Sequence, residues 1–155
     1  MKKIKLEVDK NSIIKLFQEK KFNKISKLSK QILKKYENEV DIWKIVIVSE
    51  ISIRNYFSAE KKIKKLLLIK DDPEINYLHG NVLKLQNKNL EAIEAFKKAI
   101  KLKKNFSQAY NNLGNVYKKI YKIENAIENY HLAIKYGEKN LEAYNNLGNT
   151  LKQEK

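Results

Sequence analysis

The sequence predicts an all-α fold, a solenoid of about nine helices packed as antiparallel pairs. The first observation is an internal repeat, because residues 109–115 and residues 143–149 both have the sequence AYNNLGN and lie 34 residues apart. The second is that small and bulky residues recur along the chain at nearly the same interval. The third is an apolar periodicity near 3.6 residues. A period of this length is typical of stacked helix–turn–helix units.

Recurring small residues define the register of the repeat. With position 1 at Ser107 or at Pro73, the small residues fall at positions 8, 20 and 27, namely Gly114, Ala126 and Ala133 in one repeat and Gly80, Ala92 and Ala99 in the other. When position 1 is placed 33 residues before Pro73, at Val40, position 20 is again a small residue, Ala59. A glycine inside a helix costs about 1 kcal/mol relative to alanine. Its recurrence at one position therefore predicts that the two helices of a pair pack closely.

The helices predicted in chain order span residues 11–20, 23–36, 40–53, 56–70, 74–86, 89–103, 107–119, 123–136 and 141–153. The first two cover a stretch, including FNKISKLSKQILKKY, that keeps the helical period but lacks the small residues. Asp72, Pro73 and Glu74 have the N-cap, first-position and first-turn identities that start a helix. Gly137 suits the end of the helix that precedes the second AYNNLGN.

These elements predict one domain over residues 1–155. It would comprise a diverged N-terminal repeat, three regular repeats and a C-terminal half repeat or capping helix, over residues 6–39, 40–72, 73–106, 107–140 and 141–155. A polar final helix can shield the last hydrophobic edge of a solenoid. The same ending would arise if a longer protein had been cut at this point, so the sequence leaves both alternatives open.

Composition limits the class of protein. A hydrophobic content of 43% is enough for a buried core, and the absence of cysteine excludes disulfides and thiolate metal sites and fits a reducing compartment. The start MKKIKLEVDK lacks the apolar segment of a secretory signal. No stretch approaches the roughly 18 apolar residues of a membrane span. We therefore expect a soluble, cytoplasmic protein that does not associate with membranes.

The net charge of +15 raises the question of nucleic-acid binding. Only one of the 33 basic residues is an arginine, Arg54, although arginine is the preferred residue for bidentate phosphate and base contacts. The lysines cluster near the N-terminus, at Lys20, Lys21, Lys24, Lys27, Lys30, Lys34 and Lys35. RNA binding through these lysines is one functional hypothesis, placed third after the two given below. It predicts binding that weakens steeply with salt.

The repeat resembles the tetratricopeptide repeat (TPR) over most of the chain, and most specifically over residues 73–151. This resemblance implies a right-handed solenoid whose concave surface is lined by the first helix of each repeat. It also implies that positions 2, 5, 6, 9, 12 and 13 face that surface. The candidate peptide-binding residues at these positions are Asn81, Lys84, Asn111, Asn112, Asn115, Lys118, Asn145, Asn146, Asn149 and Lys152.

Asparagine donates and accepts hydrogen bonds, so its amide matches the N–H and C=O groups of an extended peptide. Asn112 and Asn146 stand just before a Leu-Gly pair and resemble the asparagines in the TPR region of O-linked N-acetylglucosamine transferases. They would form two rungs of a peptide-binding ladder. The carboxylate clamp that other TPR proteins use on chaperone C-termini is not expected, because Tyr77 replaces its lysine and Glu142 would repel a carboxylate.

The predicted function is therefore a non-catalytic scaffold that binds an extended peptide or a partner protein in the concave groove. Lys84, Lys118 and Lys152 favour acidic partners. The two histidines, His79 and His131, fall in different repeats, and no glycine-rich phosphate loop is found, so we expect no enzyme activity, cofactor or metal. The alternative is the substrate-recruiting region of a larger glycosyltransferase or sulfotransferase. The partner, the pathway and the oligomeric state stay open.

Overall fold

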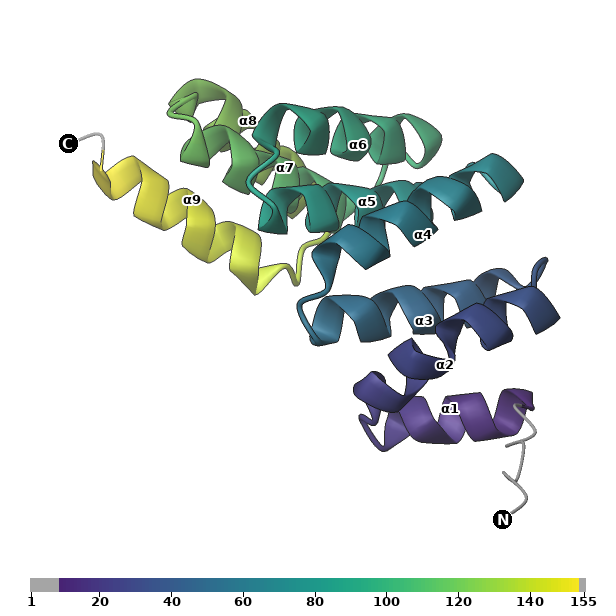
Figure 1. Ribbon diagram of the computed structural model, residues 1–155. Coiled ribbons are helices and arrows are strands. Elements are labelled where there is room, and N and C mark those ends of the chain that lie inside the picture. The colour runs from purple at the N-terminus through teal and green to yellow at the C-terminus, as the bar shows by residue number, and fades with distance from the viewer. Residues whose placement is uncertain (1–8, 154–155) are drawn as a thin grey trace, which may run out of the picture. The chain divides into compact units, whose positions relative to one another are not determined.

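A computed structural model describes residues 9–153, which form nine α-helices and no strand (Figure 1). The helices are α1 (Lys10–Gln18), α2 (Phe22–Lys35), α3 (Val40–Ser52), α4 (Tyr56–Ile69), α5 (Pro73–Leu85), α6 (Asn89–Leu102), α7 (Ser107–Lys119), α8 (Ile123–Tyr136) and α9 (Leu141–Gln153). Each predicted helix is present with its ends within two residues of the expected ones, which confirms the all-α fold. The start of the predicted first repeat lies outside the described residues.

The chain forms two compact units, Met1–Ile69 and Lys70–Lys155, called unit 1 and unit 2 below. In unit 1, α3 packs between α2 and α4, and α1 packs against α2 and α3. In unit 2, consecutive helices from α5 to α9 pack on one another, and α7 also contacts α5 and α9 directly. The continuity of all repeats in one solenoid stays a prediction.

The same turn joins the helices of four pairs. Lys20, Arg54, Asn87 and Tyr121 have left-handed φ values of 54°, 60°, 62° and 59°. In each turn the N–H of the next residue donates to the carbonyl five residues earlier, over 2.9 to 3.0 Å. This is the Schellman ending of a helix, usually completed by glycine. The left-handed region costs a non-glycine residue about 1–2 kcal/mol, so its recurrence indicates that the fold requires this turn.

Two glycines of unit 2 lie where the paired helices approach most closely. A Cβ on Gly80 would lie 2.5 Å from Cε1 of Phe96, and a Cβ on Gly114 would lie 2.6 Å from Cε1 of Tyr130. Both rings are fully buried. Gly148 occupies the same position of the next repeat, but a Cβ there would meet no atom within 4 Å. The close packing predicted from the glycine register is thus present between α5 and α6 and between α7 and α8.

Helix ends in unit 2 follow the predicted signals. The Asp72 side chain accepts a hydrogen bond from the backbone N–H of Glu74 over 2.9 Å, and Pro73 is the first residue of α5. Gly137 is the C-cap of α8, with an ordinary φ of −155°. A Cβ at Gly137 would lie 2.5 Å from Oγ of Ser107, so close approach to α7 explains this glycine.

Candidate functional site

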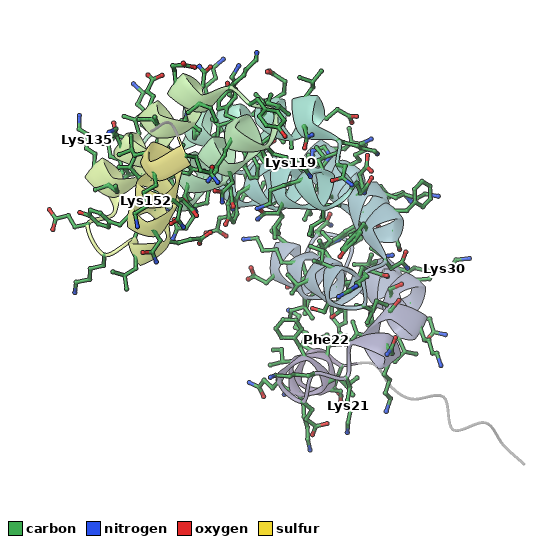
Figure 2. The ribbon with its side chains drawn as sticks, turned by 90° about the vertical axis from the view of Figure 1, so that its left-hand side faces the viewer. Lys21, Phe22, Lys30, Lys119, Lys135 and Lys152 are labelled. Atoms are coloured by element: carbon green, nitrogen blue, oxygen red, sulfur yellow. The ribbon has the colours of Figure 1, made fainter. Side chains whose placement is uncertain are left out.

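All ten candidate residues lie on α5, α7 and α9 of unit 2, whose shared surface is called the A-helix face below. Helix α5 carries two of them, and α7 and α9 carry four each. Figure 2 shows Lys152 on α9 and Lys119, the last residue of α7. The structure therefore collects these residues on neighbouring helices, but it gives them different surroundings.

Asn112 joins α7 to α5 through its side-chain amide. Its Oδ1 accepts a hydrogen bond from Nζ of Lys84 over 2.8 Å. Its Nδ2 donates to the hydroxyl of Tyr77 and to Oδ1 of Asn81, each over 3.0 Å. An asparagine amide can form about four hydrogen bonds, so most of this capacity is used within the protein. Asn112 is accordingly only 9% exposed, a burial that the sequence did not predict.

The same kind of bond joins α9 to α7. Nδ2 of Asn146 donates to Oδ1 of Asn111 over 3.0 Å, and Asn111 is only 2% exposed. These two residues lie 35 positions apart, as do Asn112 and Tyr77. In both cases the residue at position 6 of one repeat donates to the residue at position 5 of the repeat before it. The recurring asparagines therefore hold successive first helices together.

Asn115 has a third role, because its Oδ1 accepts a hydrogen bond from the hydroxyl of Tyr130 over 2.8 Å. Tyr130 is fully buried under α7, and burial raises its pKa to about 12. The neutral, hydrogen-bonded phenol is thus the stable form at any physiological pH. Asn115 itself is half-buried, and its side chain satisfies the hydroxyl group of the buried Tyr130.

The surroundings of Lys84 on the A-helix face change the pKa of its ammonium group. Partial burial lowers its pKa from the usual value, the negative charge of Glu142 opposes this shift, and the positive charge of Lys119 adds to it. Lys84 also donates to Asn112, as described above. It is therefore a half-buried, structurally held cation with a carboxylate and a second ammonium group in its vicinity.

Other candidates are accessible. Asn145, Asn149 and Lys152 are exposed on α9, and Lys118 is half-buried on α7. The side chains of Asn145 and Asn149 form no hydrogen bond with any described residue. These groups are therefore available to an incoming ligand, in contrast to the amides of Asn111 and Asn112.

A hollow of about 460 Å³ lies at the C-terminal end of α7. Its lining consists of Asn115, Lys118, Lys119, Tyr121, Ile123 and Gln153. Asn115 and Lys118 are predicted site residues, whereas the other four are additional. Lys119 and Gln153 stand at position 13 of their repeats, one of the positions that the resemblance to the tetratricopeptide repeat implies for this surface. Tyr121 lies in the turn before α8 and Ile123 is its first residue, and no motif or repeat position indicated a functional role for either.

The remaining polar groups do not assemble a metal site among residues 9–153, where no group of three or more histidine, aspartate or glutamate side chains could hold an ion. His79 is half-buried on α5 and His131 is exposed on α8. In the same part of the chain, none of the helices combines the length and the apolar character that crossing a membrane requires.

Two family models match the chain, one described as TPR repeat over residues 80–120 and one described as tetratricopeptide repeat over residues 107–140. No curated protein sequence matches. The solved structure of MamA is 24% identical with a TM-score of 0.83, covering 95% of this chain and 85% of that one. YrrB, described as a TPR protein with an unusual peptide-binding site, is 15% identical with a TM-score of 0.73, covering 93% and 75%.

The first TPR of Spaghetti (RPAP3), bound to the HSP90 peptide SRMEEVD, is also similar. It is 18% identical with a TM-score of 0.69, covering 72% of this chain and 90% of that one. These TM-scores establish a common fold, and the two family models locate the repeat in the sequence. This chain therefore carries tetratricopeptide repeats over residues 80–140 and has the fold of a tetratricopeptide-repeat protein.

Proposed function

We propose that this protein is a non-catalytic interaction module that binds an extended peptide or a partner protein on the A-helix face of unit 2. The observation that carries this proposal is the 460 Å³ hollow at the end of α7, where two side-chain amides and two ammonium groups line one cavity. Amides can bond the N–H and C=O groups of a peptide backbone, and ammonium groups attract carboxylates. Such a surface fits a peptide with acidic side chains.

The contacts divide the candidate residues into two groups with different tasks. Asn112 and Asn146 use their Nδ2 groups to bond the preceding helix, so we assign them to holding the helices in register. The groups we assign to the ligand are Lys118, which lines the hollow, and the exposed amides of Asn145 and Asn149, which lie on α9 outside its lining. A peptide ladder at Asn112, as the resemblance to O-linked N-acetylglucosamine transferases implies, would have to displace Tyr77 or Lys84 first.

The relatives support a binding role without specifying the ligand. YrrB is described as having a peptide-binding site, and the TPR of Spaghetti holds a peptide with two glutamates and a C-terminal aspartate. In this chain, Glu142 lies on α9 of the same face and would repel a nearby ligand carboxylate. We therefore propose an internal acidic segment as the ligand, in preference to a free C-terminus.

The test is a comparison of two double variants as baits in a pull-down from cell lysate, treated with nuclease, at near-physiological salt. Asn145→Ala/Asn149→Ala removes the two exposed asparagine amides of α9. Asn23→Ala/Asn125→Ala removes two exposed amides from α2 and α8 and serves as the matched control. We expect proteins captured by wild type to be retained by the control and lost from the first variant. Equal capture by all three would contradict the assigned site.

Stability measurements separate binding from folding. Asn112→Ala leaves Lys84 and Tyr77 without their acceptor and donor, so it should lower the free energy of unfolding by about 1–3 kcal/mol. Asn145→Ala/Asn149→Ala removes only exposed groups and should change it by less than about 0.5 kcal/mol per site. Urea unfolding followed by circular dichroism distinguishes the two. A binding loss in the α9 variant with unchanged stability would then report on the ligand contact itself.

A further inference from the structure

Unit 1 contains a separate hollow of about 710 Å³ between α2 and α4, with α3 contributing Trp43 to its lining. It is called the α2–α4 groove below. Five lysines line it, Lys30 and Lys34 from α2 and Lys61, Lys62 and Lys65 from α4. One carboxylate, that of Glu37, also lines it. The groove is independent of the A-helix face, which belongs to unit 2.

Four of these five ammonium groups are available to a ligand. Nζ of Lys62 contacts Oε1 of the buried Glu50 over 2.9 Å and Oγ of Ser58 over 2.6 Å, so this charge is neutralised within the protein. The other four lysines form no ion pair with any described residue, and they are all exposed. In Figure 2, Lys30 extends from α2 into the solvent. Four free cations and one anion leave the groove with a charge of +3.

The groove also exposes aliphatic side chains. Leu68 is 88% exposed and Ile69 is 46% exposed, although both are large and apolar, and Leu33 is half-buried in the α2 wall. Trp43 donates its indole N–H to the backbone carbonyl of Glu37 over 2.7 Å, so its indole N–H is already bonded. Apolar side chains next to a polar rim are typical of protein-interaction surfaces.

Along the α4 wall the lysines come first and the aliphatic side chains follow. Lys61, Lys65 and Leu68 are spaced four and three residues apart, so they lie on one stripe of the helix. Seven residues of helix span about 10 Å, which is the length of roughly two helical turns in a partner. The groove thus matches a short segment that presents carboxylates and apolar side chains on one face.

We propose that the α2–α4 groove binds an acidic amphipathic segment of a partner protein, with its carboxylates on the four free lysines and its apolar side chains on Leu33, Leu68 and Ile69. RNA is the less suitable ligand, because the lining holds no arginine and its one aromatic residue, Trp43, is only 5% exposed. Single-stranded RNA binds by stacking bases on accessible aromatic rings. A phosphate backbone also has no apolar group that could pack on the exposed Leu68.

The test uses the full chain and three fluorescent probes of equal charge: a helical peptide with glutamate and leucine on one face, polyglutamate, and oligouridylate. Anisotropy titrations at near-physiological salt compare wild type with Lys61→Glu/Lys65→Glu and with Leu68→Ser. Lys101→Glu/Lys104→Glu reverses two exposed lysines of unit 2 and is the matched charge control. All substituted side chains are exposed, and thermal unfolding of each variant checks that the fold is retained.

We expect saturable binding of the amphipathic peptide to wild type and to the charge control. The Lys61→Glu/Lys65→Glu variant should lose about tenfold or more in affinity, and Leu68→Ser about fivefold. Polyglutamate should bind more weakly than the amphipathic peptide. The proposal would be overturned if wild type showed no saturable peptide binding or if both charge variants lost affinity equally. The groove would instead be an RNA site if wild type bound oligouridylate more tightly than the amphipathic peptide and if Lys61→Glu/Lys65→Glu abolished that binding.

Discussion

Gly114→Ala adds one methyl group at the contact between α7 and α8. The new Cβ would lie 2.6 Å from Cε1 and 2.8 Å from Cδ1 of Tyr130, and 3.2 Å from the backbone oxygen of Ala126. Carbon atoms in contact prefer about 3.5–4.0 Å, so the ring must move by about 1 Å. Tyr130 is fully buried and its hydroxyl is bonded to Asn115 over 2.8 Å, so it cannot move freely.

Two effects of opposite sign determine the outcome. Overpacking a well-packed core costs about 1–3 kcal/mol, and replacing glycine by alanine within a helix gains about 1 kcal/mol. Gly148→Ala isolates the second effect, because it is the same change at the same repeat position with no atom within 4 Å. We therefore expect Gly148→Ala to stabilise the protein by up to about 1 kcal/mol. Gly114→Ala should be less stable than Gly148→Ala by about 1–3 kcal/mol.

The assay is thermal and urea unfolding of the full chain, followed by far-ultraviolet circular dichroism. For a chain of this size, about 1 kcal/mol corresponds to a change in Tm of roughly 2–4 °C. The two variants should therefore differ in Tm by about 2–12 °C, with Gly114→Ala the lower. Equal shifts in the two variants would refute the reasoning, because helix propensity alone would then explain both glycines.

Two further substitutions test the core and the turn. Because burial raises the pKa of Tyr130 to about 12, folded chains retain this proton to higher pH than unfolded chains, whose tyrosines titrate near pH 10. This contribution to stability is complete below about pH 10 and is lost toward pH 12. The free energy of unfolding of Tyr130→Phe should fall less over that range, and an unchanged pH profile would contradict this. Tyr121→Gly removes a left-handed strain at an 89% exposed site. It should raise the free energy of unfolding by about 1 kcal/mol in urea titrations, and a decrease would contradict this.

The helices could be predicted from the sequence because their signals are local and repeated. The register of Gly80 and Gly114 indicated a close helix pair, and the structure shows one aromatic ring against each glycine. Asp72 and Pro73 start α5 by interactions within a few residues of the chain. Even the diverged N-terminal repeat forms two helices, since an amphipathic period is enough when the small residues are missing.

The partners of the polar side chains could not be predicted, because they depend on contacts between repeats. The sequence placed Asn111 and Asn112 on the same wall as Asn145, yet the structure buries the first two and exposes the third. Position within a repeat was therefore not sufficient. The decisive factor is whether a neighbouring helix supplies a donor or an acceptor, as α5 does through Tyr77 and α9 does through Asn146.

The recurrence of the asparagine pair has a physical reason in this geometry. Position 6 must supply a donor, and it is asparagine in both repeats, Asn112 and Asn146. Position 5 needs only an acceptor, and it is Tyr77 in one repeat and Asn111 in the next, since a hydroxyl and an amide oxygen can both accept from an amide N–H. Asn145 occupies position 5 of the last repeat, and no described residue supplies the position 6 donor. Its free amide is therefore the group of this motif best placed to bond a peptide in the way one helix bonds the next.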